Sequence, residues 1–308
     1  MGLELLYIFM GLGLALALGG IGGDSGGGTN SASGPPATGT GTAGADSFAG
    51  TPFDDVIYGR GGDDTINGDF GNDYLDGNSG NDEIYGDVGD DSLFGGDGDD
   101  TLGGGTGLDF LRGGPGNDEL RGGADNDTLE GAENADFLQG DGGDDVLRGG
   151  PGKDYLVGNL GADSLEGGPG DDTLIGIEGD YTTVPTSSAD GADTLEGWEG
   201  ADRIVLGDGD HAYGEFAMSN ADGAADTFIT GTWVTGTPPV IHDFDPTTDI
   251  LQLWYDSGVA ASTTVTVSTV SLGGQTAYAI DFDGATRVVV VSTGSAIDAT
   301  NVVLMDGA

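Results

Sequence analysis

Residues 95–121 read GGDGDDTLG, GGTGLDFLR and GGPGNDELR, three nine-residue units in the same register. Each unit carries an aspartate at its sixth position (Asp100, Asp109 and Asp118) and a leucine two residues later. The spacing continues in both directions without a gap, so that an aspartate recurs every nine residues from Asp46 to Asp172. A period this regular is the signature of a repeat architecture, in which each unit packs only against its neighbours.

An apolar residue follows each of these aspartates by two positions, from Phe48 to Leu174, and a glycine follows by four, from Gly50 to Gly176. Alternate residues of a strand face the same side, so the aspartate and the apolar residue are predicted to point inward and the residue between them outward. The glycines allow turns with positive φ that bring backbone carbonyl groups inward. The pattern therefore predicts short strands joined by tight turns, with oxygen atoms gathered inside.

The complete unit, G-G-x-G-x-D-x-U-x with U apolar, resembles the RTX family of calcium-binding nonapeptide repeats. It is complete in the units that begin at Gly95, Gly104, Gly113, Gly149 and Gly167. The resemblance implies an all-β fold, a right-handed parallel β-roll with two nonapeptides per coil, whose turns bind several Ca²⁺ ions. Calcium prefers six to eight oxygen ligands, which carboxylates and backbone carbonyl groups supply.

With two units per coil, aspartates eighteen residues apart stack into two columns. The candidate calcium ligands of the first column are Asp46, Asp64, Asp82, Asp100, Asp118, Asp136, Asp154 and Asp172, and those of the second are Asp55, Asp73, Asp91, Asp109, Asp127, Asp145 and Asp163. The first glycines of the five complete units are candidate ligands through their carbonyl groups. Carboxylates stacked at a strand spacing of about 4.8 Å repel one another, so we expect cations between successive coils.

Some units depart from the pattern. The fourth position of the unit around Asp127 is Asp125, and the unit around Asp136 begins Gly131-Ala132-Glu133-Asn134, so we expect weaker calcium binding there or none. The Gly-Thr-Pro-Phe loop before Asp55 is typical of a capping coil. The alternative reading of these aspartates, that they only cap turns or keep the surface soluble, stays open.

The register breaks at residues 180–191, which we interpret as a loop insertion, and two further units then carry Asp193 and Asp202. If the insertion leaves the stack cleanly, Asp193 joins the column of Asp55 and Asp202 the column of Asp46. The predicted roll therefore spans residues 45–209.

The formal net charge is −47, with 54 acidic residues against seven lysines and arginines. Nucleic acid is excluded as a partner because binding its phosphate backbone needs a basic face. A compact metal-free fold of this charge would repel itself, which again favours bound cations. The absence of cysteine excludes disulfides, thiolate metal sites and cysteine catalysis.

Residues 1–23 form an apolar N-terminal segment, predicted to be helical, in which the uncharged run Leu5–Gly23 is close to the length that spans a membrane. Three interpretations stay open: an uncleaved anchor or export segment, a cleaved signal peptide, and a buried apolar terminus. Residues 24–44 are rich in Gly, Ser, Thr and Pro and are typical of a flexible linker.

Residues 210–308 are rich in β-branched residues, and strands are predicted over 263–272, 278–282 and 287–291. Ile241–Leu253 resembles the segment that follows the repeats in many RTX exoproteins, which implies a C-terminal β-rich cap and a secretion region that engages type I secretion machinery. The cap would cover the open end of the roll. His242 is interpreted as a surface or packing residue rather than a metal ligand.

The sequence predicts a non-catalytic calcium-binding protein that folds on meeting calcium outside the cell, secreted or exposed at the cell surface. It contains neither H-E-x-x-H nor G-x-S-x-G, and fewer than fifty residues precede the repeats, which argues against an RTX exoenzyme. A pore-forming toxin is disfavoured by the single long apolar run and the single lysine, Lys153. A tethered adhesin or matrix component is the main alternative, with a protein or glycan partner that the sequence does not name.

Overall fold

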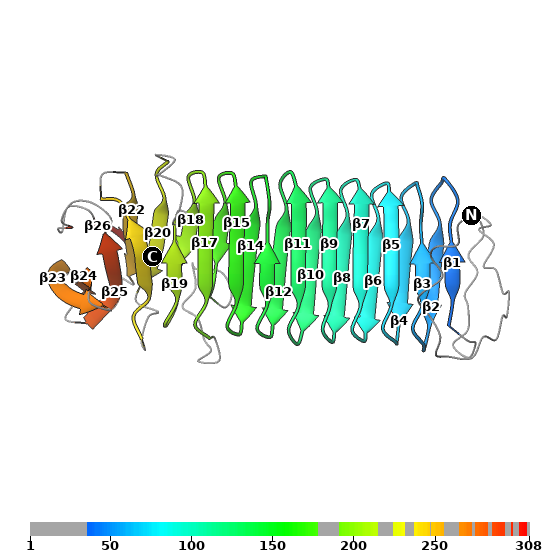
Figure 1. Ribbon diagram of the computed structural model, residues 1–308, viewed down its shortest axis with the longest axis horizontal. Helices are drawn as coiled ribbons and strands as arrows, with labels where there is room; N and C mark the ends of the chain where they lie inside the picture. Colours follow the sequence, from blue (N-terminus) through cyan, green and yellow to red (C-terminus); the bar gives the residue numbers. More distant parts are fainter. Residues whose placement is uncertain are drawn as a thin grey trace, which may run out of the picture.

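The chain forms a parallel β-solenoid of about nine turns (Figure 1). The computed structural model describes residues 36–177, 191–214, 224–231, 237–246, 248–255, 265–272, 275–282, 285–292, 297 and 302–306. All regular structure in these residues is β, and none of their segments is a helix long and apolar enough to cross a membrane. The predicted N-terminal helix and apolar run lie outside the described residues, as does most of the predicted insertion.

Two long sheets form the walls of the solenoid. Sheet A contains, in spatial order, β1 (Thr38–Thr40), β3 (Val56–Tyr58), β5 (Tyr74–Ser79), β7 (Ser92–Asp97), β9 (Phe110–Pro115), β11 (Thr128–Glu133), β13 (Val146–Arg148), β15 (Ser164–Pro169), β17 (Thr194–Glu199), β19 (His211–Tyr213), β21 (Val240–Phe244), β25 (Ala285–Ser292), β24 (Gln275–Phe282) and β23 (Val265–Leu272). Sheet B contains β2 (Ser47–Thr51), β4 (Thr65–Asp69), β6 (Glu83–Val88), β8 (Thr101–Thr106), β10 (Glu119–Ala124), β12 (Phe137–Gly142), β14 (Tyr155–Leu160), β16 (Thr173–Ile175), β18 (Arg203–Val205), β20 (Thr227–Gly231), β22 (Ile250–Tyr255) and β26 (Val302–Asp306).

The chain alternates between the sheets, so consecutive nonapeptides lie on opposite walls. Within sheet A, Leu93 pairs with Leu111, and within sheet B, Leu102 pairs with Leu120, in both cases in parallel and eighteen residues apart. One coil therefore consists of two nonapeptides, as the resemblance implied. The right-handed sense of the coil stays a prediction.

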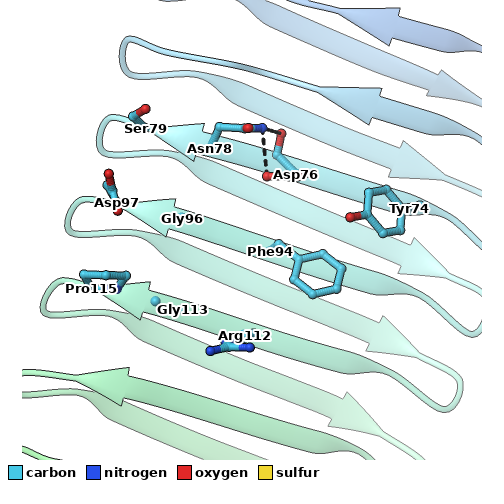
Figure 2. Close-up of a pocket in the computed structure, with 11 residues that line it drawn as sticks. Tyr74, Asp76, Asn78, Ser79, Phe94, Gly96, Asp97, Arg112, Gly113 and Pro115 are labelled. Atoms are coloured by element: carbon cyan, nitrogen blue, oxygen red, sulfur yellow. Dashed lines mark hydrogen bonds between the residues drawn. The ribbon is translucent and has the colours of Figure 1, made fainter.

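The turns keep a left-handed backbone at the second position of the unit. Gly96 and Asn78 occupy this position in neighbouring strands (Figure 2), with φ of 119° and 73°. Only glycine adopts such values freely, and Asn and Asp tolerate them better than other residues. Several units that lack the second glycine accordingly carry Asp or Asn there, among them Asp69, Asp87 and Asn159.

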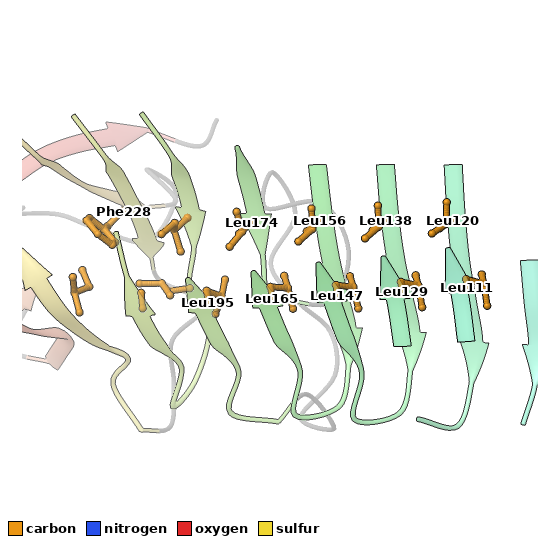
Figure 3. Packing of buried hydrophobic residues seen from close by; sticks show 14 of the residues in the cluster. Leu111, Leu120, Leu129, Leu138, Leu147, Leu156, Leu165, Leu174, Leu195 and Phe228 are labelled. Atoms are coloured by element: carbon orange, nitrogen blue, oxygen red, sulfur yellow. The ribbon is translucent and has the colours of Figure 1, made fainter. Parts of the chain in front are cut away.

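The core is a double row of the apolar residues that follow the aspartates. Sheet A contributes one row, which includes Leu111, Leu129 and Leu147, and sheet B a second, which includes Leu120 and Leu138 (Figure 3). These side chains are completely buried, whereas the residue before each is at least partly exposed. Burial of one leucine contributes about 1.5–3 kcal/mol, so the core stabilises the roll only when many coils stack. The predicted inward and outward alternation is confirmed.

Beyond the fifteenth unit the chain returns to the same two sheets. Leu165 in β15 pairs with Leu195 in β17, thirty residues later instead of eighteen, so the parallel register resumes after twelve additional residues. Strands β19 to β22 continue both parallel sheets past residue 209.

Sheet A ends in an antiparallel group, in which β24 pairs with β23 and β25, and β25 runs parallel to β21. The strands predicted over 263–272, 278–282 and 287–291 correspond to β23, β24 and β25. A separate cap domain does not stand out from the described strands, and the division into 45–209 and 210–308 stays a prediction.

Candidate metal centres

The aspartates of the repeats line up along the roll in two buried columns, held by backbone hydrogen bonds between coils. The backbone N–H of Asp82 donates to Oδ1 of Asp100 at 2.7 Å, and that of Asp100 donates to Oδ1 of Asp118 at 2.8 Å. Within the uninterrupted repeats the same bond, at 2.7–2.9 Å, reaches thirteen carboxylates: Asp64, Asp73, Asp82, Asp91, Asp100, Asp109, Asp118, Asp127, Asp136, Asp145, Asp154, Asp163 and Asp172. We call these thirteen the interior aspartates. Their two columns are those expected from the period.

The second oxygen of each interior aspartate, Oδ2, is buried and has no hydrogen-bond donor in the described part of the protein. A buried carboxylate oxygen left without a donor or a cation is costly, because the desolvation of its charge is not compensated. Thirteen such oxygens at equivalent positions cannot be accidental exceptions, since buried polar atoms in folded proteins are rarely unsatisfied. The columns therefore need positive charge beside Oδ2.

The first glycine of the unit opens the space beside Oδ2. A Cβ atom added to Gly95 would collide with Oδ2 of Asp100 and would lie 2.8 Å from the carbonyl oxygen of Gly113, in the next coil. The other four predicted glycines border the space in the same way, since a Cβ on Gly104, Gly113, Gly149 or Gly167 would meet the following aspartate. Carboxylate and carbonyl oxygens from adjacent coils thus converge beside a backbone position that only glycine can occupy.

These carboxylate and carbonyl oxygens are suitable ligands for a hard divalent cation. Calcium takes carboxylate and backbone carbonyl oxygens, whereas zinc and copper prefer nitrogen or sulfur. Among the described residues, no three His, Cys, Asp or Glu side chains are grouped as a metal site. A site in this roll is therefore built from the column carboxylates together with carbonyl groups of the turns.

The electrostatics of the columns show the cost of leaving them without metal. Burial raises the pKa of Asp127 and Asp136 to about 8, from an ordinary value of 3.8. The backbone N–H donors partly oppose this rise in pKa, and neighbouring carboxylates of the same column add to it. The pKa of Asp100 rises to about 7 and that of Asp91 to about 6 for the same leading reason. Near neutral pH the metal-free roll must take up protons or a cation.

The N-terminal end of the roll is different. Both oxygens of Asp55 are hydrogen-bonded by Thr51, whose backbone N–H donates to Oδ2 at 2.6 Å and whose hydroxyl donates to Oδ1 at 3.0 Å. In Asp46, Oδ2 accepts from the hydroxyl of Thr42 at 2.9 Å and from its backbone N–H. These two carboxylates are satisfied locally, which agrees with the capping role expected for the coil at Asp55.

The incomplete units keep the backbone path of the complete ones. Asp125, Ala132 and Asn134 adopt φ of 75°, 94° and 79°, in the left-handed region where complete units have glycine. Asp127 and Asp136 remain in the columns with the same hydrogen bonds as their neighbours, and their Oδ2 atoms likewise have no donor among the described residues. Their geometry thus gives no reason to separate them from the complete units, and their affinity for calcium stays a prediction.

The columns continue past the regular repeats. The N–H of Asp163 donates to Asp193 and the N–H of Asp172 to Asp202, so the structure places each in the column expected if the insertion leaves the stack. Three further aspartates extend the columns and were not predicted from the sequence: Asp210, Asp226 and Asp249. Each is followed two residues later by an apolar residue (Ala212, Phe228 and Leu251), but their spacing is irregular. The signal that could have identified them is the D-x-U triplet, an aspartate followed two residues later by an apolar residue, taken without the nine-residue period.

His242 lies outside the columns, on sheet A. Its Nε2 is 2.8 Å from Nδ1 of His211, and its ring stacks on that of Tyr213 with centroids 4.5 Å apart. The interpretation of His242 as a packing residue agrees with these contacts, but the pairing with His211 was not foreseen.

A parallel solenoid with buried aspartate columns and glycine-lined oxygen sites is the architecture of a calcium-binding repeat protein. The family described as RTX calcium-binding nonapeptide repeat (4 copies) matches residues 40–75, 69–102, 76–111, 103–138, 130–165, 148–182 and 189–210, together more than half of the chain. The chain therefore belongs to this family. No curated protein matches it, so the assignment rests on the repeats themselves.

Proposed function

We propose that this protein binds a series of Ca²⁺ ions between successive coils along both columns, and that this binding drives folding of the roll. The carrying observation is the set of thirteen buried Oδ2 atoms that have no donor in the described part of the protein, each packed against a glycine and, as at Asp100, close to a carbonyl oxygen of the next coil. The residues that would hold calcium are the interior aspartates, together with glycine carbonyl groups such as that of Gly113. Bound calcium supplies the positive charge that the columns lack.

Folding and calcium binding are linked because the sites exist only where coils are stacked. When calcium binds only the folded form, each site stabilises that form by RT ln(1 + [Ca²⁺]/Kd). Adjacent sites share a coil, so filling one orders half of the next, and the transition should be cooperative along the roll. The chain is thus expected to stay unfolded at the low calcium concentration of a cytosol and to fold where calcium is abundant.

This dependence supports a role outside the cell, either as a secreted protein or at the cell surface, with a non-catalytic structural or binding function. A tethered adhesin or matrix component is the alternative, distinguished by retention of the apolar segment 5–23 in the membrane. Fractionation of producing cells separates the two, because a secreted protein appears in the medium and a tethered one sediments with membranes. Recovery in the cytosol would contradict both.

Circular dichroism of the full chain during a calcium titration tests the folding claim. In chelator near pH 8 the spectrum should be that of an unfolded chain, and calcium should produce β-structure in a steep transition that chelator reverses. Magnesium is the matched control, because it requires a rigid octahedral shell and retains its water. Full β-structure in excess chelator at this pH would overturn the proposal, as would an unfolded spectrum at saturating calcium.

A further inference from the structure

The outer face of sheet A carries a row of four aromatic rings, which we call the aromatic row: Tyr58, Tyr74, Phe94 and Phe110. They come from the adjacent strands β3, β5, β7 and β9, and successive ring centroids are 5.7, 5.2 and 5.8 Å apart. Each ring is half-buried, so one side of the row packs on the sheet and the other stays accessible. The row is an amphipathic platform on a wall of the roll that the calcium columns do not use.

A depression of about 500 Å³ adjoins the two middle rings of this row, those of Tyr74 and Phe94. Gly96, Gly113 and Gly114 line it and contribute no side chains. The rings of Tyr74 and Phe94 stand side by side at one end of it (Figure 2). The glycines that the turns require therefore also create a shallow trough across the strands.

Polar groups border the trough next to the rings. Asn78 donates from Nδ2 to Oδ1 of Asp76 at 2.8 Å, which fixes both side chains at the edge of the depression (Figure 2). Arg112 is the register partner of Phe94 on the neighbouring strand β9. It is exposed, and its guanidinium donors are available at the surface. A carboxylate, an amide and a guanidinium beside stacked rings offer both donors and acceptors to a ligand with an apolar face.

The architecture excludes several kinds of occupant. A peptide cannot add as a strand here, because β3, β5, β7 and β9 are each hydrogen-bonded to a neighbour on both sides. A nucleic acid or an anionic polysaccharide would be repelled by a protein of net charge −47. A drug-sized apolar molecule would need a deep enclosed pocket, and this trough is shallow.

We propose that the aromatic row and the trough bind a neutral glycan chain with flat, equatorially substituted pyranose rings. The C–H face of such a ring packs on an aromatic ring, and its hydroxyl groups pair with Asp76, Asn78 and Arg112. Rings repeated on successive strands suit a polymer whose units recur at a similar distance. This goes beyond calcium binding, although it needs the folded roll.

Aromatic pairs on neighbouring strands also stabilise sheets, so a purely structural role is the competing explanation. The chain contains its own control for that role. Phe137 and Tyr155 form a stacked pair on sheet B, with centroids 5.5 Å apart. If aromatic contacts only stabilise the sheets, substitution of Tyr74 and Phe94 should have the same effect on glycan binding as substitution of Phe137 and Tyr155.

The test measures binding of cellohexaose and chitohexaose to the calcium-saturated full chain by isothermal titration calorimetry, with an alginate oligomer as the anionic comparison. The variant Tyr74→Thr with Phe94→Gln removes the two rings at the trough; Thr128 and Gln139 occupy the equivalent positions of other units. The control variant is Phe137→Thr with Tyr155→Thr. Two stacking contacts of this kind correspond to an affinity change of about tenfold or more.

We expect the wild type and the sheet B variant to bind at least one neutral hexasaccharide, alginate not to bind, and the sheet A variant to bind about tenfold more weakly. Calcium-dependent circular dichroism should be the same for all three proteins, which separates loss of the glycan surface from loss of folding. Failure of the folded wild type to bind any neutral glycan would overturn the proposal, as would equal losses in the two variants. A failure of calcium to fold the wild type would instead overturn the proposed function.

Discussion

The first coil and the interior coils of the roll contain the same aspartate and treat it differently. In the interior, Asp100 accepts one backbone N–H at Oδ1 and buries an Oδ2 that has no donor in the described structure. At the N-terminal end, Asp55 has both oxygens hydrogen-bonded, because Thr51 supplies its backbone N–H and its hydroxyl. The position in the repeat is therefore insufficient to define a calcium site. The defining feature is a carboxylate oxygen that the protein itself leaves without a partner.

The same contrast appears at the other end of the columns. The backbone N–H of Gly207 donates to Oδ2 of Asp210 at 2.6 Å, and the N–H of Asp245 donates to Oδ2 of Asp249 at 2.7 Å. Local donors thus satisfy carboxylates at both ends of the aspartate columns. We infer that calcium belongs to the interior of the roll and that hydrogen bonds close its ends.

The largest expected effect is that the pH dependence of the roll's stability reverses when calcium is removed. Burial raises the pKa of Asp82 and raises that of the other interior aspartates to about 6–8, so the folded metal-free roll binds more protons than the unfolded chain. This contribution to stability is fully present below about pH 4 and is lost as pH rises through these values. In chelator, β-structure measured by circular dichroism should therefore be greater near pH 5 than near pH 8.

With saturating calcium the dependence should have the opposite sign, because protons compete with calcium for the same carboxylates. Urea unfolding at a series of pH values measures both slopes. Equal slopes with and without calcium would show that the interior aspartates are not its ligands.

A methyl group in the oxygen-lined space should have the next largest effect. Gly95→Ala places a Cβ against Oδ2 of Asp100, and Gly44→Ala, in the first turn, meets no atom within 4 Å. Overpacking costs about 1–3 kcal/mol, to which Gly95→Ala adds the loss of calcium at that space. Urea unfolding in saturating calcium should show this loss for Gly95→Ala and a change near zero for Gly44→Ala. Equal effects would mean that the space beside Oδ2 has no special role.

A smaller effect is expected from a single carboxylate. Asp100→Asn keeps an acceptor for the backbone N–H of Asp82 but removes the negative charge. Asp55→Asn removes the charge of a carboxylate at the end of the roll. Equilibrium dialysis should give fewer calcium ions for Asp100→Asn, with a two- to threefold higher midpoint as a rough expectation for one weakened site among many. Asp55→Asn should bind as many ions as the wild type. A loss of ions in Asp55→Asn would remove the distinction between the end and the interior.

The smallest effect concerns the incomplete unit around Asp136. Ala132 has φ of 94°, a conformation that an L-residue adopts only with strain, so Ala132→Gly should stabilise the calcium-loaded roll by about 0.5–1 kcal/mol. Ala135→Gly, in the same loop without that conformation, should be neutral or destabilising. Thermal unfolding of the two variants measures the difference. A destabilised Ala132→Gly would show that the incomplete unit has relaxed away from the common backbone path.

The fold and the interior columns were predictable because they depend on a strict period and a strict alternation. Asp64 to Asp172, and the return at Asp193 and Asp202, follow from counting residues, since each coil repeats the geometry of the one before. Asp210, Asp226 and Asp249 were not predictable in this way, because the chain between them varies in length while the strands still pair. The hydrogen bonds that satisfy Asp46 and Asp55 depend on where Thr42 and Thr51 lie after folding. The aromatic row depends on which residues become neighbours across strands eighteen residues apart.

The most direct test is a crystal structure of the calcium-loaded protein with anomalous scattering recorded to locate the ions. We predict two rows of calcium peaks along the roll, each within bonding distance of Oδ2 of interior aspartates and of carbonyl groups such as that of Gly113, and no peak beside Asp46 or Asp55. Calcium confined to the exposed acidic surface, or an interior Oδ2 row without calcium in a folded roll, would contradict the account.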